Sequence, residues 1–479
     1  MPSTTDLETG SVLDLLSSLA EKSLVVHEDV KGVVRFRLLE MVKAYGRDLQ
    51  EEHGEDQWIR GAHRDYYVRL AESMEPRLSG PEQADTLDAF EVDHDNFRQA
   101  LQYSLQEENA AVGLRLVAAM GHFWKVRGYW REGMGWCDAF LRLPTSDDNP
   151  PARAKVLNTF GTLAEILGDL RLAGKLLEQA LEIREREGDR PGAADTLNNL
   201  GVVSARLADY ERSKHLHERS LEISRTLNDP RMIAIALSNL GIVALDTGDF
   251  ELARKLLLES LAMKRKIGDR RGTANTLSNL AVMANEQGDP KTAWRLQKEA
   301  YEIRCDLGDK QGIATSLNNL GQIACDRGDF EEAKRHFEES IAIRRELRSI
   351  QGLGLVLGNL GKTLERQGNL RGALSLYKET IVYKHQLGDR KGVAISLEMI
   401  AKLCVDAGQA RSATLLFGFA VGVRKSLHTP VPPSEHQSYQ EAIERLRQKI
   451  PTEEFELAWV QGRNMGIERA IEIANSIEL

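Results

Sequence analysis

The amino-acid sequence predicts an all-α protein whose central part is a solenoid of repeated helix pairs. Two observations carry this prediction. Small residues recur every 40 positions from residue 121 onward, and their register does not slip across eight units. The segments between them carry apolar residues at helical spacing. With 479 residues, 42% of them hydrophobic, the chain has enough apolar material to bury such a stack.

Three columns of small residues define the repeat unit. The first holds Gly121, Gly161, Gly201, Gly241, Ala281, Gly321, Gly361 and Ala401. The second holds Gly128, Gly168, Ala208, Gly248, Gly288, Gly328, Gly368 and Gly408. The third holds Gly133, Ala173, Ser213, Ala253, Ala293, Ala333, Ala373 and Ala413. Glycine inside a helix costs about 1 kcal/mol relative to alanine, so the first column predicts a close approach between the two helices of a unit.

Each unit is expected to form two helices joined by a short turn. In one unit the helices cover residues 231–247 and 250–267, with Gly248 and Asp249 between them. Glycine can take the left-handed conformation that ends a helix, and aspartate can cap the next one. The second column therefore predicts the turns between helices.

These units resemble tetratricopeptide repeats, with Leu240-Gly241, Ala253 and Ser260 at the signature positions. The resemblance covers about residues 111–428, two thirds of the chain, as about eight units of 40 residues. It implies a right-handed superhelical solenoid that recognises peptides or proteins. The unit is longer than the usual repeat, and residues 268–280 resemble the long repeats of kinesin light chains and Pins-type adaptors.

The two ends of the chain depart from the repeat pattern. Residues 1–52 predict a helix, a β-hairpin with its turn at 29–32, and a second helix, which we interpret as a partial winged helix. Residues 53–110 predict a helical linker. After a proline-rich turn that follows residue 428, residues 429–479 predict capping helices, which a solenoid needs at its end.

Short strings near the N-terminus resemble the bacterial STAND signal-transduction ATPases, including LuxR-type and antibiotic-regulator members. They are KSLV at 22–25, RFRLLE at 35–40, EVDHDNFR at 91–98 and FWKVRG at 123–128. The resemblance implies that the repeats are the ligand- or partner-sensing arm of a signalling or transcription-regulatory ATPase. In that family a nucleotide-binding domain precedes the winged helix, and this chain does not contain one. The chain is then either the C-terminal part of a longer ATPase or a stand-alone scaffold that bridges protein partners.

Composition argues against several other functions. The net charge is −9, and residues 11–50 carry six basic and six acidic side chains, so we expect no direct binding to nucleic acid. No apolar run approaches the roughly 20 residues that span a bilayer, and the N-terminus lacks a signal pattern. We therefore expect a cytoplasmic protein without a membrane partner. The four cysteines form no CxxC pair and are expected to pack as small apolar groups.

No set of residues predicts catalysis, a metal site or a cofactor. The string GNLGKT at 358–363 lacks the spacing of a phosphate loop and lies within a predicted helix. His215 and His217 are two apart on a helix and point to different sides, so they cannot share a metal. The sequence therefore predicts a protein that is not an enzyme and that has no metal ligands.

The predicted binding site is the concave groove of the solenoid, which the first helix of each unit lines. One column there reads Asn199, Asn239, Asn279, Asn319 and Asn359. Each side chain offers a donor and an acceptor, so the column can hydrogen-bond the backbone of an extended peptide. The neighbouring candidate positions are Asn198, Arg206, Asp246, Asn275, Glu286, Asn318, Gln322, Asp326, Lys362 and Arg366. The expected ligand is a peptide or protein segment of mixed charge, with a small inducer as the alternative.

Two alternatives stay open at this point. The asparagines could instead bond to the neighbouring helix and only stabilise the stack, because a mid-helix asparagine needs some such reason. The repeats of kinesin light chains and Pins adaptors bind peptides across the equivalent asparagines, which favours binding. The aromatic residues Phe123, Trp124, Tyr129, Trp130 and Trp136 could form a ligand cage. Their spacing within one helix pair favours packing at the junction instead.

Overall fold

The computed structural model describes residues 9–30, 33–78, 82–347, 349–427, 431 and 433–479. Within these residues the regular secondary structure is helical except for one two-stranded antiparallel sheet. The predicted hairpin turn at 29–32 and the turn after residue 428 lie partly outside the described residues. The chain divides into two units. One comprises Met1–Leu70 with Asp93–Asn109, and the other comprises Ala71–Val92 with Ala110–Leu479.

The smaller unit contains the β-hairpin. Its elements are α1 (Thr9–Glu21), β1 (Val25–Val30), β2 (Val33–Leu38), α2 (Glu40–Glu52), most of α3 (Asp56–Met74) and α5 (His94–Gln106). Strand β1 pairs with β2 from Val25 opposite Leu38 to Val30 opposite Val33. The order of helix, hairpin and helix agrees with the order expected, and the winged-helix interpretation stays a prediction.

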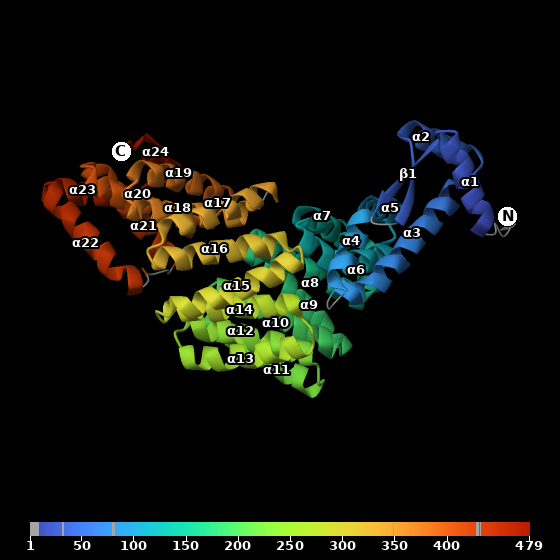
Figure 1. The fold of residues 1–479 in the computed structure, drawn as a ribbon, viewed down its shortest axis with the longest axis horizontal. Coiled ribbons are helices and arrows are strands. Elements are labelled where there is room, and N and C mark those ends of the chain that lie inside the picture. The colour runs from blue at the N-terminus through green and yellow to red at the C-terminus, as the bar shows by residue number, and fades with distance from the viewer. Residues whose placement is uncertain (1–8, 31–32, 79–81, 348, 428–430, 432) are drawn as a thin grey trace. The chain divides into compact units, whose positions relative to one another are not determined.

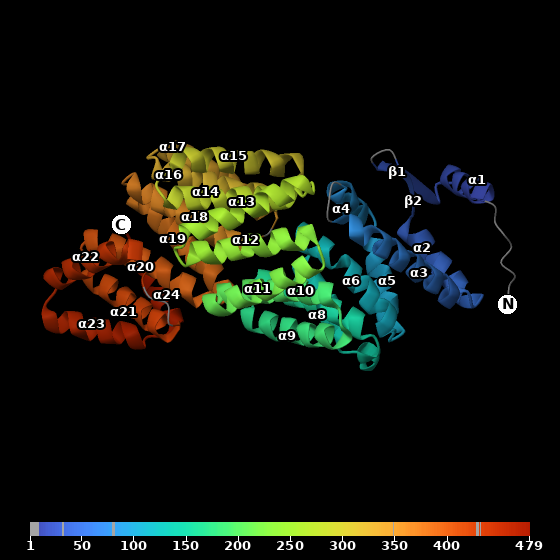
Figure 2. The same cartoon turned by 90° about the horizontal axis from the view of Figure 1, so that it is seen from below.

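The larger unit holds the repeats (Figures 1 and 2). It begins with η1 (Glu75–Leu78), α4 (Gln83–Val92), α6 (Ala110–Arg127), α7 (Trp130–Leu141) and η2 (Pro144–Asp148). The regular pairs are α8 (Pro150–Leu167) and α9 (Leu170–Glu187), α10 (Arg190–Arg206) and α11 (Tyr210–Thr226), α12 (Pro230–Asp246) and α13 (Phe250–Lys266), α14 (Arg270–Glu286) and α15 (Pro290–Asp306), α16 (Lys310–Asp326) and α17 (Phe330–Glu346), α18 (Ile350–Arg366) and α19 (Leu370–Gln386), and α20 (Arg390–Asp406) and α21 (Ala410–Leu427). It ends with α22 (Pro433–Lys449), α23 (Thr452–Asn464) and α24 (Ile467–Ser476).

Each helix of the stack ends and begins where the small-residue columns predict. Gly248 has φ +82°, and the Asp249 carboxylate accepts a hydrogen bond from the backbone N–H of Leu252 at 3.1 Å. The same left-handed turn and cap recur along the stack. Ala208 takes the glycine position of its unit with φ +63°, a conformation that costs an alanine about 1 kcal/mol.

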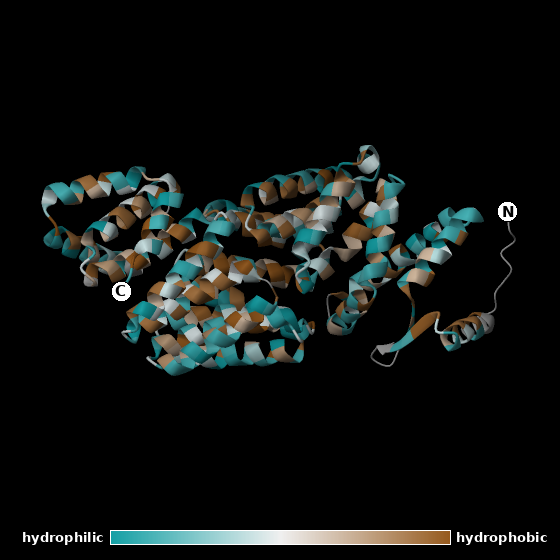
Figure 3. Ribbon diagram, turned by 90° about the horizontal axis from the view of Figure 1, so that it is seen from above, coloured by the Kyte–Doolittle hydropathy of each residue, from teal (hydrophilic) through white to brown (hydrophobic). Residues whose placement is uncertain are grey.

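The glycine column marks the predicted close approach within the pairs from Gly161 onward, whereas a Cβ atom on Gly121 would meet Thr159 of α8 in the next repeat. A Cβ atom on Gly241 would lie 2.8 Å from Leu257 and 3.5 Å from the carbonyl oxygen of Ala253 on the partner helix. A Cβ on Gly361 would lie 2.5 Å from the Tyr377 ring. Apolar faces meet between the helices and hydrophilic residues lie on the outer sides (Figure 3).

A column of buried cations, which the sequence analysis missed, connects the repeats. Its members stand in the last turns of the second helices, and the buried ones are Arg184, Lys264, Arg304, Arg344 and Arg424. Lys264 donates to Thr276 Oγ1 at 2.9 Å, and Arg304 donates to Ser316 Oγ at 2.6 Å in the following helix. Because buried charges need polar partners, these bonds fix one repeat against the next.

The structure can also be compared with the predictions about membrane-spanning segments, metal ligands and cysteines. Among the described residues, no helix is long and apolar enough to cross a membrane. In the same residues, no group of three or more His, Cys, Asp or Glu side chains is placed to hold a metal ion. Cys137, Cys325 and Cys404 are buried, whereas Cys305 is exposed, so the expectation of apolar packing was wrong for that cysteine.

Candidate binding groove

The first helices of successive repeats form the inner layer of the stack. Helices α8, α10, α12, α14, α16 and α18 each contact the first helix of the neighbouring repeat as well as their own partner. In a curved stack the elements that approach one another most closely lie on the concave side. We therefore expect the accessible columns of these helices to line the concave groove.

Two asparagines of the predicted column have unused hydrogen-bonding capacity. Asn239 on α12 and Asn279 on α14 are half-buried. Within the part of the chain that the structure describes, neither side chain makes a hydrogen bond or ion pair. Amide groups in this position can both donate to and accept from a peptide backbone. They are the best-placed residues of the column for contact with a ligand.

The other three asparagines of the column bond within the stack. Asn199 donates to Asn158 Oδ1 of α8 at 3.0 Å, and Asn359 donates to Asn318 Oδ1 of α16 at 3.0 Å. Asn319 donates to Gln297 Oε1 of α15 at 3.4 Å. The stabilising role left open for this column therefore has support at these three positions.

Asn198 and Asn318 lie between helices rather than on the groove surface. Their side chains are 3% and 7% exposed. Asn198 Oδ1 is 3.0 Å from Nδ1 of buried His217 on α11. One residue along a helix is a rotation of about 100°, which turns this column toward the partner helix. These two side chains therefore belong to the packing of the stack.

The remaining candidates are polar side chains of the first helices. Arg206 pairs with Glu165 of α8, and Asn275 accepts from Arg304 at 2.8 Å. Gln322 donates to Asp326 at 3.1 Å, and Arg366 lies 3.6 Å from Asp326 on the adjacent helix. Lys362 is half-buried on α18. Most of these side chains are thus already bonded to neighbours.

Acidic side chains gather at the C-terminal ends of the inner helices. Burial raises the pKa of Asp246. Burial, and then the nearby charge of Asp246, raises the pKa of Glu286. Neither carboxylate has a hydrogen bond or ion pair within the described residues. This edge of the groove has a negative potential that favours a cationic part of a ligand.

A cavity of about 580 Å³ lies at the N-terminal end of the groove. Residues of α6, α8, α10 and α12 line it, among them His122, Lys125, Lys155, Asn199 and Arg231. Burial, followed by the charges of Arg271, Lys125 and Arg231, lowers the pKa of His122 to about 3. His122 is therefore neutral at physiological pH, and its Nε2 lies 3.2 Å from the Gln83 amide.

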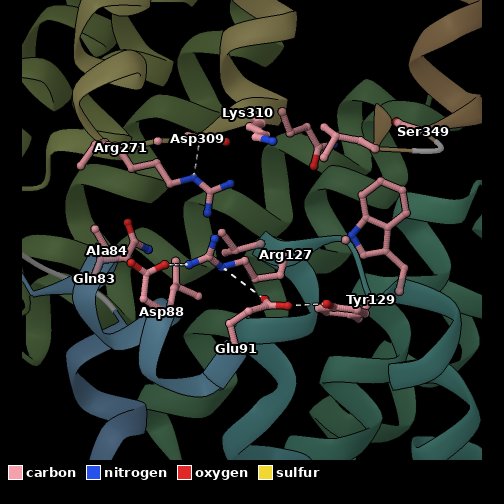
Figure 4. Close-up of a pocket in the computed structure, with 18 residues that line it drawn as sticks. Gln83, Ala84, Asp88, Glu91, Arg127, Tyr129, Arg271, Asp309, Lys310 and Ser349 are labelled. Carbon is pink, nitrogen blue, oxygen red and sulfur yellow. Dashed lines mark hydrogen bonds and ion pairs between the residues drawn. The ribbon is translucent and has the colours of Figure 1, made fainter. Parts of the chain in front are cut away.

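The lining of a second cavity, of about 380 Å³, includes Val126, the residue after Lys125 (Figure 4). The guanidinium groups of Arg127 and Arg271 point toward each other from opposite walls (Figure 4). Arg127 pairs with Asp88 of α4, and Arg271 lies 3.4 Å from Asp309, the cap of α16. Segments far apart in sequence thus meet across the curve of the solenoid.

The aromatic residues near this end divide between core and cavity. Phe123 and Trp124 are fully buried, and Trp136 stacks on Phe140, as the packing interpretation predicts. Tyr129 and Trp130 instead line the second cavity. The sequence analysis missed the cations of both cavities. One signal was available, because His122 stands in the same 40-residue column as Gln322 and Lys362.

Comparisons with known proteins agree with this architecture. The tetratricopeptide repeat family matches residues 152–226, 232–306 and 312–382. Residues 152–382 therefore contain tetratricopeptide repeats, and the predicted repeat class and solenoid fold are confirmed. Such repeats form protein-interaction domains, and the fold is typically a binding scaffold without catalysis.

The curated relatives are much longer proteins. A Mycobacterium tuberculosis protein named as an HTH-type transcriptional regulator is 36% identical over 136 residues, which are 28% of this chain and 15% of that protein. Its Mycobacterium bovis counterpart gives the same values. The match to this chain thus spans only 15% of the length of either relative.

Solved structures share the fold at low identity. The Rap conjugation gene regulator of plasmid pLS20, in complex with the Phr* peptide, has a TM-score of 0.51 at 13% identity and covers 69% of this chain and 96% of that one. A STAND protein with a tetratricopeptide repeat sensor from Pyrococcus horikoshii has a TM-score of 0.49 at 18% identity and covers 90% and 60%. At 13% identity, the likeness to the Rap regulator concerns the fold alone.

Proposed function

We propose that the concave groove captures an extended peptide or protein segment. The observation that carries this proposal is the pair of half-buried asparagines, Asn239 and Asn279, on the inner layer of successive repeats. Their amides have no partner among the described residues and stand one repeat apart, so both can engage one extended chain. The mixed charge of the groove, acidic at Asp246 and Glu286, suits a peptide better than a polyanion.

We further propose that ligand occupancy is transmitted to an effector, with the repeats acting as the sensor arm of a transcription-regulatory ATPase. The resemblance of residues 22–25, 35–40 and 91–98 to STAND proteins supports this role. The similarity to longer mycobacterial proteins named as HTH-type transcriptional regulators supports it as well. A stand-alone scaffold that bridges two proteins is the alternative.

The test combines peptide selection with two sets of variants. Peptides selected from a random display library on the wild-type chain are measured by fluorescence anisotropy against Asn239→Ala/Asn279→Ala. The double variant should lose about tenfold or more in affinity, since two ligand hydrogen bonds are removed. Its melting temperature should stay unchanged, because neither amide bonds within the stack. Unchanged affinity would contradict the groove assignment.

Asn199→Ala provides the contrast, because its amide bonds to Asn158. It should lower the melting temperature while changing affinity less than the double variant does. For the sensor role, hydrogen exchange across α1 and α2 is compared with and without a selected peptide. Slower or faster exchange there on binding supports transmission, whereas identical exchange favours the scaffold.

A further inference from the structure

The acidic side chains that line the N-terminal cavity are already engaged. Glu75 pairs with Lys155 at 2.8 Å. Asp195 accepts from Asn158 at 2.9 Å and lies 3.5 Å from Arg184. Asp229 caps α12 by accepting from two backbone N–H groups, at 3.0 and 3.1 Å. The negative charge in this cavity is therefore taken up by local partners.

Lys125 differs from the other cations of the cavity. Its side chain is accessible to solvent, and its ammonium makes no hydrogen bond or ion pair with any described residue. Desolvation of the ammonium by the surrounding helices, and then the charge of Arg271, lowers the pKa of Lys125, while Asp195 and Glu165 act in the opposite direction. An ammonium held near other cations without a counter-ion gains most from an anion that enters.

Arg231 strengthens the positive potential around Lys125, since it lines the same cavity from α12. His122 lies one turn earlier on α6 and adds no charge, because it is neutral. Both Arg231 and Arg271 lie close enough to depress the pKa of His122. A charge-assisted hydrogen bond inside such a partly enclosed, cation-lined space is about twice as strong as one between neutral groups.

We propose that this cavity binds a carboxylate of the ligand that the groove captures, with Lys125 as its direct partner. The inference rests on the proposed function and adds a direction to it. Asp246 and Glu286 repel a carboxylate at the other edge of the groove. The acidic part of the peptide therefore lies against α6 and α12, and the peptide binds in one orientation.

The probes are short peptides of defined charge. The first is a fluorescent pentaglutamate that is blocked at both ends. The second is a pentaalanine with a free C-terminal carboxylate, and the third is its amidated form. Binding of the first identifies an acidic side chain as the source of the carboxylate, and binding of the second but not the third identifies the chain terminus. If neither carboxylate probe binds at millimolar concentration, the proposal is overturned.

Lys125→Gln is the decisive variant, since it keeps a polar side chain only one atom shorter and removes its charge. The variant should have about tenfold or more lower affinity for whichever carboxylate probe binds, the effect expected for one hydrogen bond to a charged group. The exposed Lys255→Gln on α13 is the matched control and should leave affinity unchanged. Equal affinity of wild type and Lys125→Gln, with both chains folded, overturns the proposal.

The two proposals fail in different ways. If Lys125→Gln has no effect while Asn239→Ala/Asn279→Ala loses affinity for selected peptides, the groove binds peptide but the proposed carboxylate site is wrong. If the asparagine variant has no effect while Lys125→Gln loses affinity for the carboxylate probe, the cavity binds an anion but the groove does not bind peptide. The variant Lys125→Glu should not bind pentaglutamate at all, because a carboxylate then replaces the ammonium that the probe would contact.

Discussion

Cations occupy two contrasting regions of this solenoid. Between the repeats, Arg304 and Lys264 are buried and bonded to the next helix. In the N-terminal cavity, Lys125 is accessible and has no counter-ion among the described residues. Both regions use the same residue types on helices of the same repeat family. The difference shows that the available partners, and not the residue type, decide whether a cation is bonded within the stack or lacks a counter-ion.

The contrast is sharpest at Arg424, where the stack contains a buried ion pair. Arg424 bonds to both oxygens of Glu398 at 2.8 and 2.7 Å, and the two side chains are 7% and 6% exposed. Arg424→Met would leave the Glu398 carboxylate buried without a counter-charge. We expect it to lower the free energy of unfolding by about 3–5 kcal/mol, measured from the urea midpoint by circular dichroism.

The double variant Arg424→Met/Glu398→Met tests the reason for this loss. If an unpaired buried charge causes it, replacing both partners should restore most of the stability. A double variant as unstable as the single one would show that the pair itself, or its packing, supplies the stabilisation. Lys125→Gln should leave the urea midpoint unchanged, in keeping with its accessible position.

Arg304 should give an intermediate effect. Its guanidinium donates to Ser316 Oγ at 2.6 Å, to Asn275 Oδ1 at 2.8 Å and to the carbonyl of Gly312 at 3.3 Å. Arg304→Met removes these bonds and leaves buried Ser316 without that donor, which should cost about 2 kcal/mol. Hydrogen exchange should accelerate first in α16. Arg295→Met on the exposed face of α15 is the control, and an equal loss there would contradict the role of the column.

The repeat architecture was predictable because its signals are local. A left-handed glycine and an aspartate cap act within one turn, so Gly248 and Asp249 indicate the end of one helix and the start of the next without knowledge of tertiary structure. The close approach at Gly241 follows from the same register, since the third-column Ala253 stands on the facing helix. Each of these predictions needed only residues within a single unit.

The N-terminal cavity that Lys125 lines was not predictable in the same way. Lys125 and Arg231 come together because the stack curves through several repeats, and the curvature accumulates from small rotations that no single residue specifies. The buried cations were missed for a related reason. A lysine near the end of an amphipathic helix ordinarily indicates an exposed position, and only the following helix makes Lys264 buried. The choice between Asn198 and Asn199 required helical rotation, which the sequence does supply.

Lys264 offers the smallest effect over a single pH unit and the most specific one, a change of stability with pH. Burial lowers the pKa of Lys264 to about 8, below the ordinary value of 10.5, while Asp269 acts in the opposite direction. Between these two pH values the unfolded chain binds more protons than the folded chain. Stability attributable to Lys264 therefore rises as the pH increases from about 8 to about 10.5 and is lost as the pH falls back through 8.

The measurement is the difference in unfolding free energy between wild type and Lys264→Met across this pH range. Taking the difference removes the titration of tyrosines and other lysines that the two chains share. The free energy of unfolding of the wild type should increase relative to that of the variant by about 1 kcal/mol per pH unit. Lys255→Met, which alters an exposed lysine on the same helix, should show no such slope. Parallel curves for wild type and Lys264→Met would mean that Lys264 is as well solvated as the exposed Lys255, and the contrast between the two regions would not hold at this position.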